Sequence, residues 1–296
     1  MRVVLLGTAA GGGFPQWNCA CALCAAARDG KLPSRTQECV AVTGNARDWW
    51  LLNASPDIRP QLTATAALWP GPGPRDIPVR GVLLTDAEPD HVAGLTVLRG
   101  AAGLKVYAPS PVLTALTPAR AVLDRYAPWE WADSLAEGGF VLAGGLVVTA
   151  HPVGTKAPKY LPPRPPDDHW VTAYRIEDLA TGGALVYAPC VEAWTDTFDD
   201  LLTTADCAVL DGTFFTVDEM GPPVRAGTGA GRPRPAHLPV SGPGGSLGRL
   251  AAHPGVRRIY THLNNTNPLL DAGSAARGQV NGAGIEVLMD GAEFVV

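Results

Sequence analysis

Charged residues are scarce in this sequence. They make up 17% of the 296 residues, and the formal net charge is -5. No run of Lys and Arg occurs along the chain. Because binding to nucleic-acid phosphates depends on clustered basic side chains, the composition argues against a general nucleic-acid-binding protein.

Long hydrophobic runs are lacking at the N-terminus. The chain begins with Met1 and Arg2, and the apolar run 3–6 ends at Gly7. A signal peptide needs an apolar region of roughly 7–15 residues, and a membrane-spanning helix needs about 20. We therefore expect a cytoplasmic protein that does not span a membrane.

The six cysteines are poorly placed for disulfides. Three of them, at 19, 21 and 24, lie too close together for mutual bridges of normal geometry. Cys39, Cys190 and Cys207 lie in or beside apolar runs and are predicted to be small buried side chains. The sequence does not support a secreted, disulfide-stabilised protein.

What is present is a large apolar fraction, 46% of residues, with 34 Gly and 28 Pro. Such a chain can bury a sizeable core and has many turns. No stretch reads as a linker, so we expect one domain over residues 1–296. Strands alternating with helices predict a layered α/β (α+β) fold. The expected strands are 2–6, 39–43, 49–53, 79–84, 105–108, 146–150, 171–176, 184–188, 208–211 and 258–262; the expected helices are 62–69, 91–99, 111–126 and one from Ser246, with loops at 70–74, 162–166 and 221–245.

An acidic cluster follows the predicted strand 79–84. Asp86, Glu88, Asp90 and His91 supply four potential ligands where a strand ends, the edge at which α/β proteins usually bind ligands. A helix-capping turn with Asp90 as N-cap is the alternative. Two later strands also end in potential ligands, Asp211 and His262. Together, two imidazoles and two carboxylates can form the ligand set of one transition metal.

The order of these motifs resembles the metallo-β-lactamase superfamily, whose first motif is H-x-H-x-D-H. Asp86 and Glu88 stand where that motif has its leading histidines, whereas Asp90 and His91 match it. The resemblance implies that one metal half-site is kept and the other altered. Asp86 and Glu88 could still be further metal ligands. His151 could supply the mid-chain ligand of the altered half-site, but one histidine with carboxylates makes a poor zinc site.

The resemblance also implies roles for residues of the second half. Asp211 corresponds to the bridging aspartate and His262 to the last histidine ligand, with Asp211 either a ligand or a neighbour of the ligands. His237 lies where the tRNA-processing branch carries an extra catalytic histidine, and a surface loop histidine is the alternative.

Longer sequence segments, spread over nearly the whole chain, resemble those of the coenzyme PQQ synthesis protein B family. This family resemblance implies a four-layer αββα sandwich and a role in the biosynthesis of pyrroloquinoline quinone (PQQ). The segments that carry it are 18–24, 85–95, 211–215, 237–242 and 261–268.

The family resemblance further implies a mononuclear Fe(II) enzyme that uses O2 to hydroxylate the tyrosine ring of a peptide-derived tyrosine/glutamate precursor, and other divalent metals could also bind. One alternative is a carrier involved in transport of PQQ or its precursor to the periplasm. Another is a metal-dependent hydrolase, which is disfavoured because a water bridging two metals needs both half-sites. The sequence leaves monomer and homodimer open.

Several polar residues are expected to contact the precursor, those of the loop 156–160 because cations orient carboxylates. For Lys156, Lys159 and Tyr160, an ordinary solvated loop is the alternative. The residues expected to contact the precursor are Lys156, Lys159, Tyr160, Asn264 and Asn267.

The cysteine cluster predicts a structural zinc site in the N-terminal loop at about 17–26. Cys19, Cys21 and Cys24 are spaced so that three thiolates can surround one tetrahedral ion. Related superfamily members use a similar cluster with a histidine where this chain has Asn265. The fourth ligand is therefore open between Asn265, a water and a carboxylate elsewhere.

Overall fold

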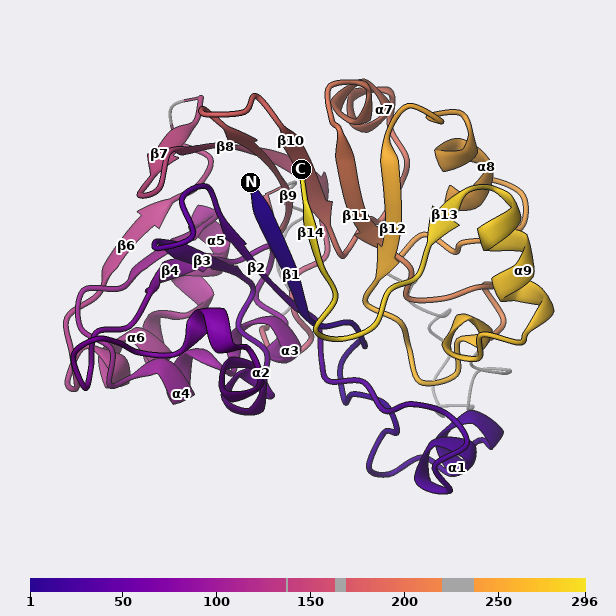
Figure 1. Ribbon diagram of the computed structural model, residues 1–296, viewed down its shortest axis with the longest axis horizontal. Helices are drawn as coiled ribbons and strands as arrows, with labels where there is room; N and C mark the ends of the chain where they lie inside the picture. Colours follow the sequence, from indigo (N-terminus) through magenta and orange to yellow (C-terminus); the bar gives the residue numbers. More distant parts are fainter. Residues whose placement is uncertain (137, 163–168, 220–236) are drawn as a thin grey trace.

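Two β-sheets packed face to face, with helices on their outer sides, make up the protein in the computed structural model (Figure 1). The structure describes residues 1–136, 138–162, 169–219 and 237–296. The chain therefore forms four layers, as the resemblance implied.

The first sheet has the strand order β14-β1-β2-β3-β4-β5-β6. Its strands β3 to β6 are mutually parallel, and β14 pairs with β1, so the two chain ends lie near each other (Figure 1). Helices α2 to α6 cover its outer face. The strands are β1 Arg2–Gly7, β2 Cys39–Thr43, β3 Trp49–Leu52, β4 Val79–Leu83, β5 Lys105–Ala108, β6 Glu130–Asp133 and β14 Glu293–Val295; the helices are α2 Ile58–Ala64, α3 Pro89–Val92, α4 Leu95–Leu98, α5 Ser110–Ala115 and α6 Thr117–Leu123.

The second sheet has the order β13-β12-β11-β10-β9-β8-β7, with β10 to β13 parallel. Helices α7 to α9 cover it, and α1 lies apart from both sheets beside the N-terminal loop (Figure 1). The strands are β7 Phe140–Leu142, β8 Leu146–Gly154, β9 Val171–Asp178, β10 Ala184–Ala188, β11 Cys207–Asp211, β12 Arg257–Thr261 and β13 Ile285–Glu286; the helices are α1 Ala22–Arg28, α7 Asp196–Thr203, α8 Ser246–Ala251 and α9 Ala275–Gly282.

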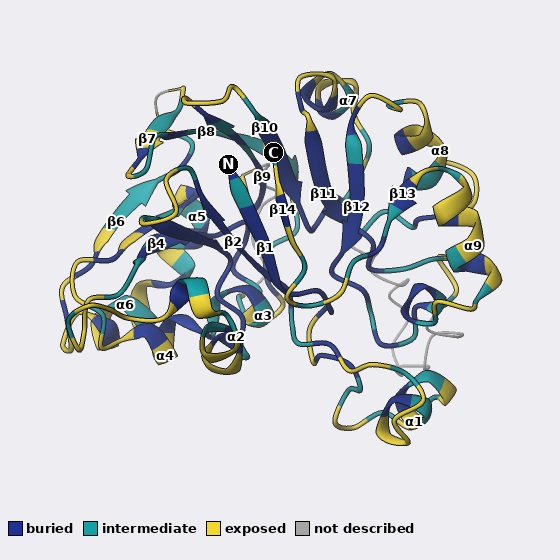
Figure 2. Ribbon diagram, viewed as in Figure 1, coloured by how far each residue is buried: buried dark blue, intermediate teal, exposed yellow. Residues whose placement is uncertain are grey.

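Strand alternation explains the layering. In β1, Val3 and Leu5 face the core between the sheets, whereas Val4 and Leu6 face the helices. Successive side chains of a strand point to opposite faces, so a strand covered on both sides is apolar throughout. Most strands are accordingly buried, and exposed residues lie on the outer helices and loops and on the edge strands β6, β7 and β14 (Figure 2).

All the predicted strands are confirmed, because unbroken apolar runs are typical of such doubly covered strands. The helix predicted over 91–99 is wrong in detail and divides into α3 and α4. Gly94 between them donates to the carbonyl of Ala54, and a Cβ there would lie 2.2 Å from the carbonyl oxygen of Ser55. This close approach presses α3 against the end of β3.

Two other helix predictions also need correction. The span 111–126 divides into α5 and α6, because Pro118 starts a new helix. The helix expected over 62–69 is α2 followed by a 3-10 turn, Ala66–Leu68. The predicted start at Ser246 is confirmed. Of the predicted loops, residues 163–166 and 221–236 lie outside the described residues.

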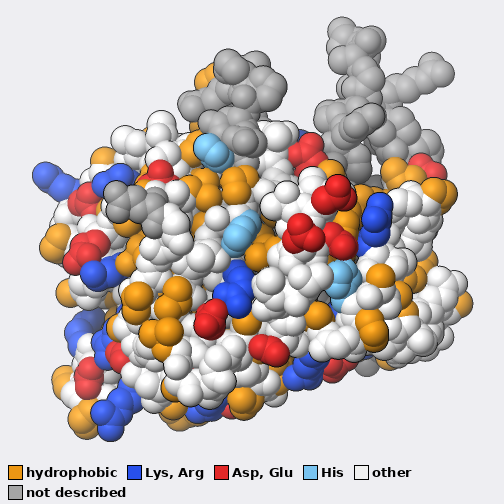
Figure 3. Space-filling view, turned by 90° about the horizontal axis from the view of Figure 1, so that it is seen from above, with side chains coloured by type: hydrophobic (Ala, Val, Ile, Leu, Met, Phe, Trp, Pro, Cys, Tyr) orange, Lys and Arg blue, Asp and Glu red, His pale blue; other side chains and the backbone are white. Residues whose placement is uncertain are grey.

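The visible face in Figure 3 carries acidic and basic side chains interspersed with apolar ones. Within the described parts of the chain, no helix has the length and apolar character needed to cross a bilayer.

Candidate metal centre

Parallel strands bring the predicted ligands to one edge of each sheet. In the second sheet, Asp211 at the end of β11 is level with Thr261 of β12, so His262 emerges beside it. In the first sheet, β4 leads into α3, which carries His91. The two edges face each other, and the candidate site lies between them.

His91 is held by Asp86. Its Nδ1 lies 2.9 and 2.7 Å from the two carboxylate oxygens, and the backbone N–H of Glu88 and the hydroxyl of Thr85 also donate to this carboxylate. A carboxylate behind an imidazole fixes its tautomer and leaves the other nitrogen free for a metal. Among the described residues, the buried Nε2 of His91 has no hydrogen-bond partner.

Asp90 and His262 face this nitrogen. The Oδ2 of Asp90 lies 3.9 Å from the Nε2 of His91 and 3.2 Å from the Nε2 of His262. The centres of the two imidazole rings are 5.1 Å apart. His262 has a φ of 58°, which turns its ring at the end of β12. Such left-handed backbone in a non-glycine residue is costly and is characteristic of functional sites.

Thr213 orients His262. Its hydroxyl lies 2.7 Å from the Nδ1 of His262 and donates to Asp211 at 2.7 Å. In the tautomer in which this hydroxyl accepts the Nδ1 proton, the Nε2 of His262 carries a lone pair and lies 3.2 Å from the carboxylate of Asp90. Both histidines thus present Nε2 to the space beside Asp90, and the donor set fits a metal ion.

Asp211 has both oxygens occupied by protein donors. Oδ1 accepts from the backbone and hydroxyl of Thr213, and Oδ2 accepts from the backbone of Val191 and from the Nδ1 of His237, the last two at 2.8 Å. The carboxylate lies within 4.8 Å of nitrogens of His237 and His262. In this arrangement it orients His237 and lies close enough to the histidines to be a ligand, so both roles that the sequence left open stay predictions.

His237 lies next to the two other histidines. Its ring stacks on that of His262 with centres 5.2 Å apart, and its side chain keeps 16% of its surface exposed. Its Nδ1 is bound by Asp211, so its Nε2 is available. This placement differs from a free surface loop, the alternative for His237.

The pKa values of the site residues depend on burial and on the charge pairs between histidines and carboxylates. Burial alone would keep the Asp90 carboxyl neutral, but the charge of His91 outweighs it and lowers the pKa of Asp90. For His91, burial opposes the charged form, but the carboxylates of Asp86 and Asp90 raise its pKa to about 10. Burial lowers the pKa of His262. A metal ion here therefore competes with a proton on His91.

Two residues of the site had not been predicted. Cys190 follows β10, and its sulfur lies within 4.8 Å of the nitrogens of His91 and His262. Its position after an apolar strand, like that of Asp211, was the available signal. Glu38 is fully buried; it accepts from Tyr187 at 2.5 Å and Asn53 at 3.4 Å, and burial raises its pKa to about 7. Nothing in the sequence around Glu38 indicates this position.

The predicted substrate contacts of the loop after β8 differ in exposure and in the residues that they contact. Lys156 lies 3.7 Å from Glu88, both about one-third exposed, and the Tyr160 hydroxyl donates to the carbonyl of Ala87. Lys159 is exposed. Glu88 therefore pairs with a cation at the rim, and its place among the metal ligands stays a prediction.

The two asparagines predicted to contact the substrate differ in burial and in their hydrogen-bond partners. Asn264 is half-buried and donates to Thr266. Asn267 is fully buried and donates to the carbonyls of Gly212 and Thr213, so its prediction as a substrate contact is wrong: the amide holds the loop after β11. His151 turns to Thr149 and belongs to none of the potential metal-binding groups of the described residues, which corrects its suggested role.

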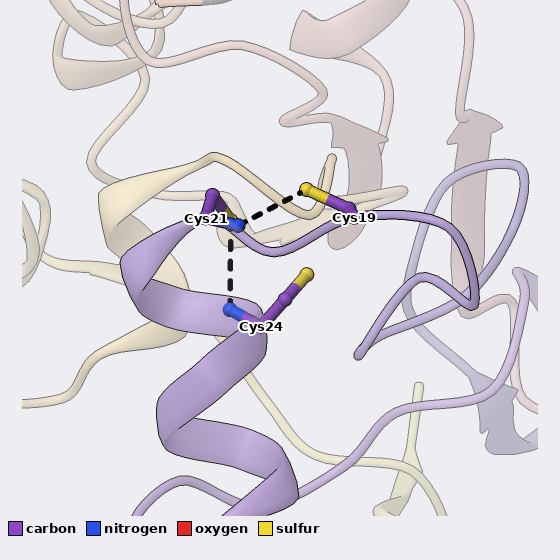
Figure 4. A group of neighbouring side chains, drawn as sticks. All are labelled: Cys19, Cys21 and Cys24. Atoms are coloured by element: carbon purple, nitrogen blue, oxygen red, sulfur yellow. Dashed lines mark hydrogen bonds between the residues drawn. The ribbon is translucent and has the colours of Figure 1, made fainter.

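The cysteine cluster converges as predicted (Figure 4). The sulfurs of Cys19, Cys21 and Cys24 lie within 4.8 Å of one another. Cys21 caps α1, since its sulfur accepts from the backbone of Cys24. The amide of Asn265 lies 3.1 Å from the sulfur of Cys19 and 3.5 Å from that of Cys24. Asn265 therefore occupies the open side of the trio.

Two facing sheets with histidine and carboxylate ligands at their edges define a protein of the metallo-β-lactamase class. A family model described as "Beta-lactamase superfamily domain" matches residues 48–263. Within that class, the chain belongs to the coenzyme PQQ synthesis protein B family. It is 41% identical to the Nitrosococcus oceani protein of that name, with 100% of each chain covered, and 39% identical to that of Pseudomonas putida (strain W619), with 98% of each covered.

A solved structure of the same family shares the fold. The chain matches Zn(2+)-bound PqqB from Methylobacterium extorquens with a TM-score of 0.89 and 35% identity, and all of each chain is covered. The predictions of the family and of the fold class are confirmed.

Proposed function

We propose that this protein acts in PQQ biosynthesis as a mononuclear metal-dependent oxygenase. Its reaction is the hydroxylation of the tyrosine ring of a peptide-derived precursor. The observation that carries the proposal is the buried Nε2 of His91, which has no hydrogen-bond partner in the described part of the chain and faces the Nε2 of His262 and the carboxylate of Asp90. Two imidazoles and one carboxylate with open positions suit ferrous iron.

Bound to these residues, Fe(II) would supply the capacity to activate O2. One oxygen atom enters a ring C–H bond and the other leaves as water, so the reaction consumes two protons and two electrons from an external reductant, for example a thiol. The carboxylate of Asp86 is already bound by His91, Thr85 and Glu88. A second ion next to it therefore lacks the ligands that a two-metal hydrolase needs.

The surrounding residues orient the ligands and move protons. Asp86 and Thr213 hold the Nδ1 atoms of His91 and His262, so both Nε2 atoms stay directed at the metal position. Asp211 holds the Nδ1 of His237, which leaves the Nε2 of that ring as a proton acceptor for the phenol of the precursor.

The rim binds the precursor in this proposal. Lys156, now paired with Glu88 at 3.7 Å, would exchange that partner for a precursor carboxylate. Lys159, Tyr160 and Asn264 would add contacts around it, with Tyr160 already positioned through Ala87.

A structural zinc ion completes the proposal. Cys19, Cys21 and Cys24 would hold it, with Asn265 on the open side. The Zn(2+)-bound relative supports zinc as a metal for this family. The three sulfurs come from one short segment, and Asn265 ties that segment to the loop after β12.

The test is O2 consumption by anaerobically loaded ferrous protein with a tyrosine-containing precursor peptide and a thiol reductant. The expected product gains one oxygen atom by mass spectrometry. His262→Ala should abolish uptake because it removes a ligand, whereas the control His151→Ala should retain it. Equal uptake by wild type and His262→Ala contradicts the proposal.

The alternatives give different results in the same preparation. A carrier binds the precursor with undiminished affinity after chelation, measured by calorimetry. A two-metal hydrolase holds two active-site ions per chain, measured by elemental analysis on protein whose cysteine cluster is loaded with zinc. If O2 uptake is absent, the first result supports the carrier and the second supports the hydrolase, in place of the oxygenase.

A further inference from the structure

Cys190 lies where a metal ligand would lie, and the roles above do not use it. Its sulfur and the imidazole nitrogens of His91 and His262 all lie within 4.8 Å of one another. The residue is buried, with 6% of its surface exposed. Ordinary burial in a core does not require a thiol to lie within this distance of two imidazole nitrogens.

We propose that the thiolate of Cys190 is a protein ligand of the active-site metal, beside Asp90, His91 and His262. The inference rests on the proposed metal site and assigns its fourth protein donor. Metal–sulfur bonds near 2.3 Å and metal–nitrogen bonds near 2.0 Å, as zinc has in proteins, place ligand atoms roughly 3.5 Å apart. The observed separations allow that geometry with small shifts.

A second observation points to the same ion. The Nε2 of His91 is buried and has no partner among the described residues, although its Nδ1 is firmly bound by Asp86. An unpaired buried nitrogen is costly, and an ion between His91, His262 and Cys190 would remove that cost.

Asp211 belongs to a different group of potential ligands, with His237 and His262, and not to the group of His91, Cys190 and His262. Its oxygens accept from Val191, Thr213 and His237. The same contact places the thiol, because the Val191 N–H that binds Asp211 directly follows Cys190. The carbonyl of Val191 accepts from Leu238 at 2.7 Å, so the turn after β10 is held on both sides. The carboxylate predicted as a ligand thus helps to position the thiol.

A thiolate would change the preferences of the site. Thiolates are soft donors that favour zinc and copper(I) over hard ions such as magnesium, whereas a carboxylate at the same corner favours harder ions. A four-donor site also leaves fewer positions open to O2 and precursor than a three-donor site. We therefore expect the affinity of the site for zinc, relative to that for manganese, to depend on the side chain at position 190.

The experiment uses cobalt(II) as an optical probe. The cysteine cluster is kept loaded with zinc, the active site is emptied with a weak chelator, and cobalt is added without oxygen. We expect a near-ultraviolet thiolate-to-cobalt charge-transfer band in wild type. The band should disappear in Cys190→Ala while the visible cobalt bands persist, and it should remain in the control Cys207→Ala, whose thiol lies in the core between the sheets.

Affinity provides the second readout. Cys190→Ala should weaken zinc binding at the active site roughly tenfold or more, since even loss of a residue behind a ligand costs 10–100-fold. Cys190→Asp should shift the preference from zinc towards manganese. An unchanged band and unchanged zinc affinity in Cys190→Ala overturn the proposal.

The outcome separates this inference from the proposed function. A Cys190-dependent band without O2 uptake keeps the ligand and removes the oxygenase. O2 uptake with a band that does not depend on Cys190 keeps the oxygenase and removes the ligand. His262→Ala, which should lose the visible cobalt bands too, shows whether cobalt occupies the intended site.

Discussion

At the scale of single residues, the candidate centre consists of imidazoles that each have one nitrogen bound by an oxygen atom. Asp86 binds His91, Thr213 binds His262 and Asp211 binds His237. Each oxygen partner fixes one tautomer, so the three Nε2 atoms are left for a metal or a proton. A change in a partner therefore acts through the histidine that it holds.

Glu38 makes stability depend on pH in the metal-free protein. Burial raises its pKa from 4.5 to about 7, so the folded chain holds a proton that the unfolded chain releases between these values. Its contribution to the free energy of unfolding is full below pH 4.5 and is lost as the pH rises through about 7. The difference is about 3 kcal/mol.

Glu38→Gln should remove this pH dependence. We expect urea unfolding of chelated protein to show a smaller loss of stability between about pH 5 and 7.5 in the variant than in wild type. Glu293→Gln, on the exposed edge strand β14, should behave like wild type. An identical pH slope for wild type and Glu38→Gln contradicts the assignment.

At the scale of elements, contacts around the cysteine cluster join α1 to the loop before it. Arg28 donates to the carbonyls of Cys19 and Gln16, and Cys24 is the buried anchor of α1. A seven-residue helix is not stable by itself. A bound zinc ion would supply the missing stability.

Cys24→Ser should lose this zinc and release the loop. We expect one fewer zinc per chain by elemental analysis and faster proteolysis between residues 17 and 30, with active-site metal retained. Cys39→Ala, a buried thiol outside the cluster, should keep both metals. Loss of the active-site metal in Cys24→Ser would mean that the loop supports the centre directly.

At the scale of the whole molecule, one core joins the two sheets. Trp50 and Leu83 of the first sheet pack with Tyr174, Ile176 and Val209 of the second, and all of them are buried. Sheets that share a core unfold together. We therefore predict that the chain unfolds as one cooperative unit, as the single domain expected over residues 1–296 would.

Ile176→Ala should destabilise both sheets at once. A cavity of this kind costs about 2–5 kcal/mol, and tryptophan fluorescence and circular dichroism should report the same, shifted urea midpoint. Val141→Ala, with a largely exposed side chain on β7, should change stability by less than about 0.5 kcal/mol. Two separate transitions in either probe would contradict a single unit.

The strands could be predicted because their apolar runs are covered on both sides, whereas helix ends could not. Gly94 divides a helix through its contact with Ser55, a residue 39 positions earlier that no local pattern connects to it. In the candidate centre, Asp90, His91 and His262 were identified from strand ends and from the family resemblance. Their convergence follows from parallel neighbours such as β11 and β12.

The sequence by itself determined that Asp86 and Glu88 stand where the superfamily motif has histidines, and it supplied Asp90, His91 and His262 as candidate ligands. Only the tertiary structure decided which groups face the metal position. Cys190 follows β10 and Asp211 ends the parallel neighbour β11. The carboxylate is bound by His237 and Val191, whereas the thiol lies beside His91 and His262. That choice depends on hydrogen bonds between distant segments and on backbone torsions such as that of His262, which residue types alone do not specify.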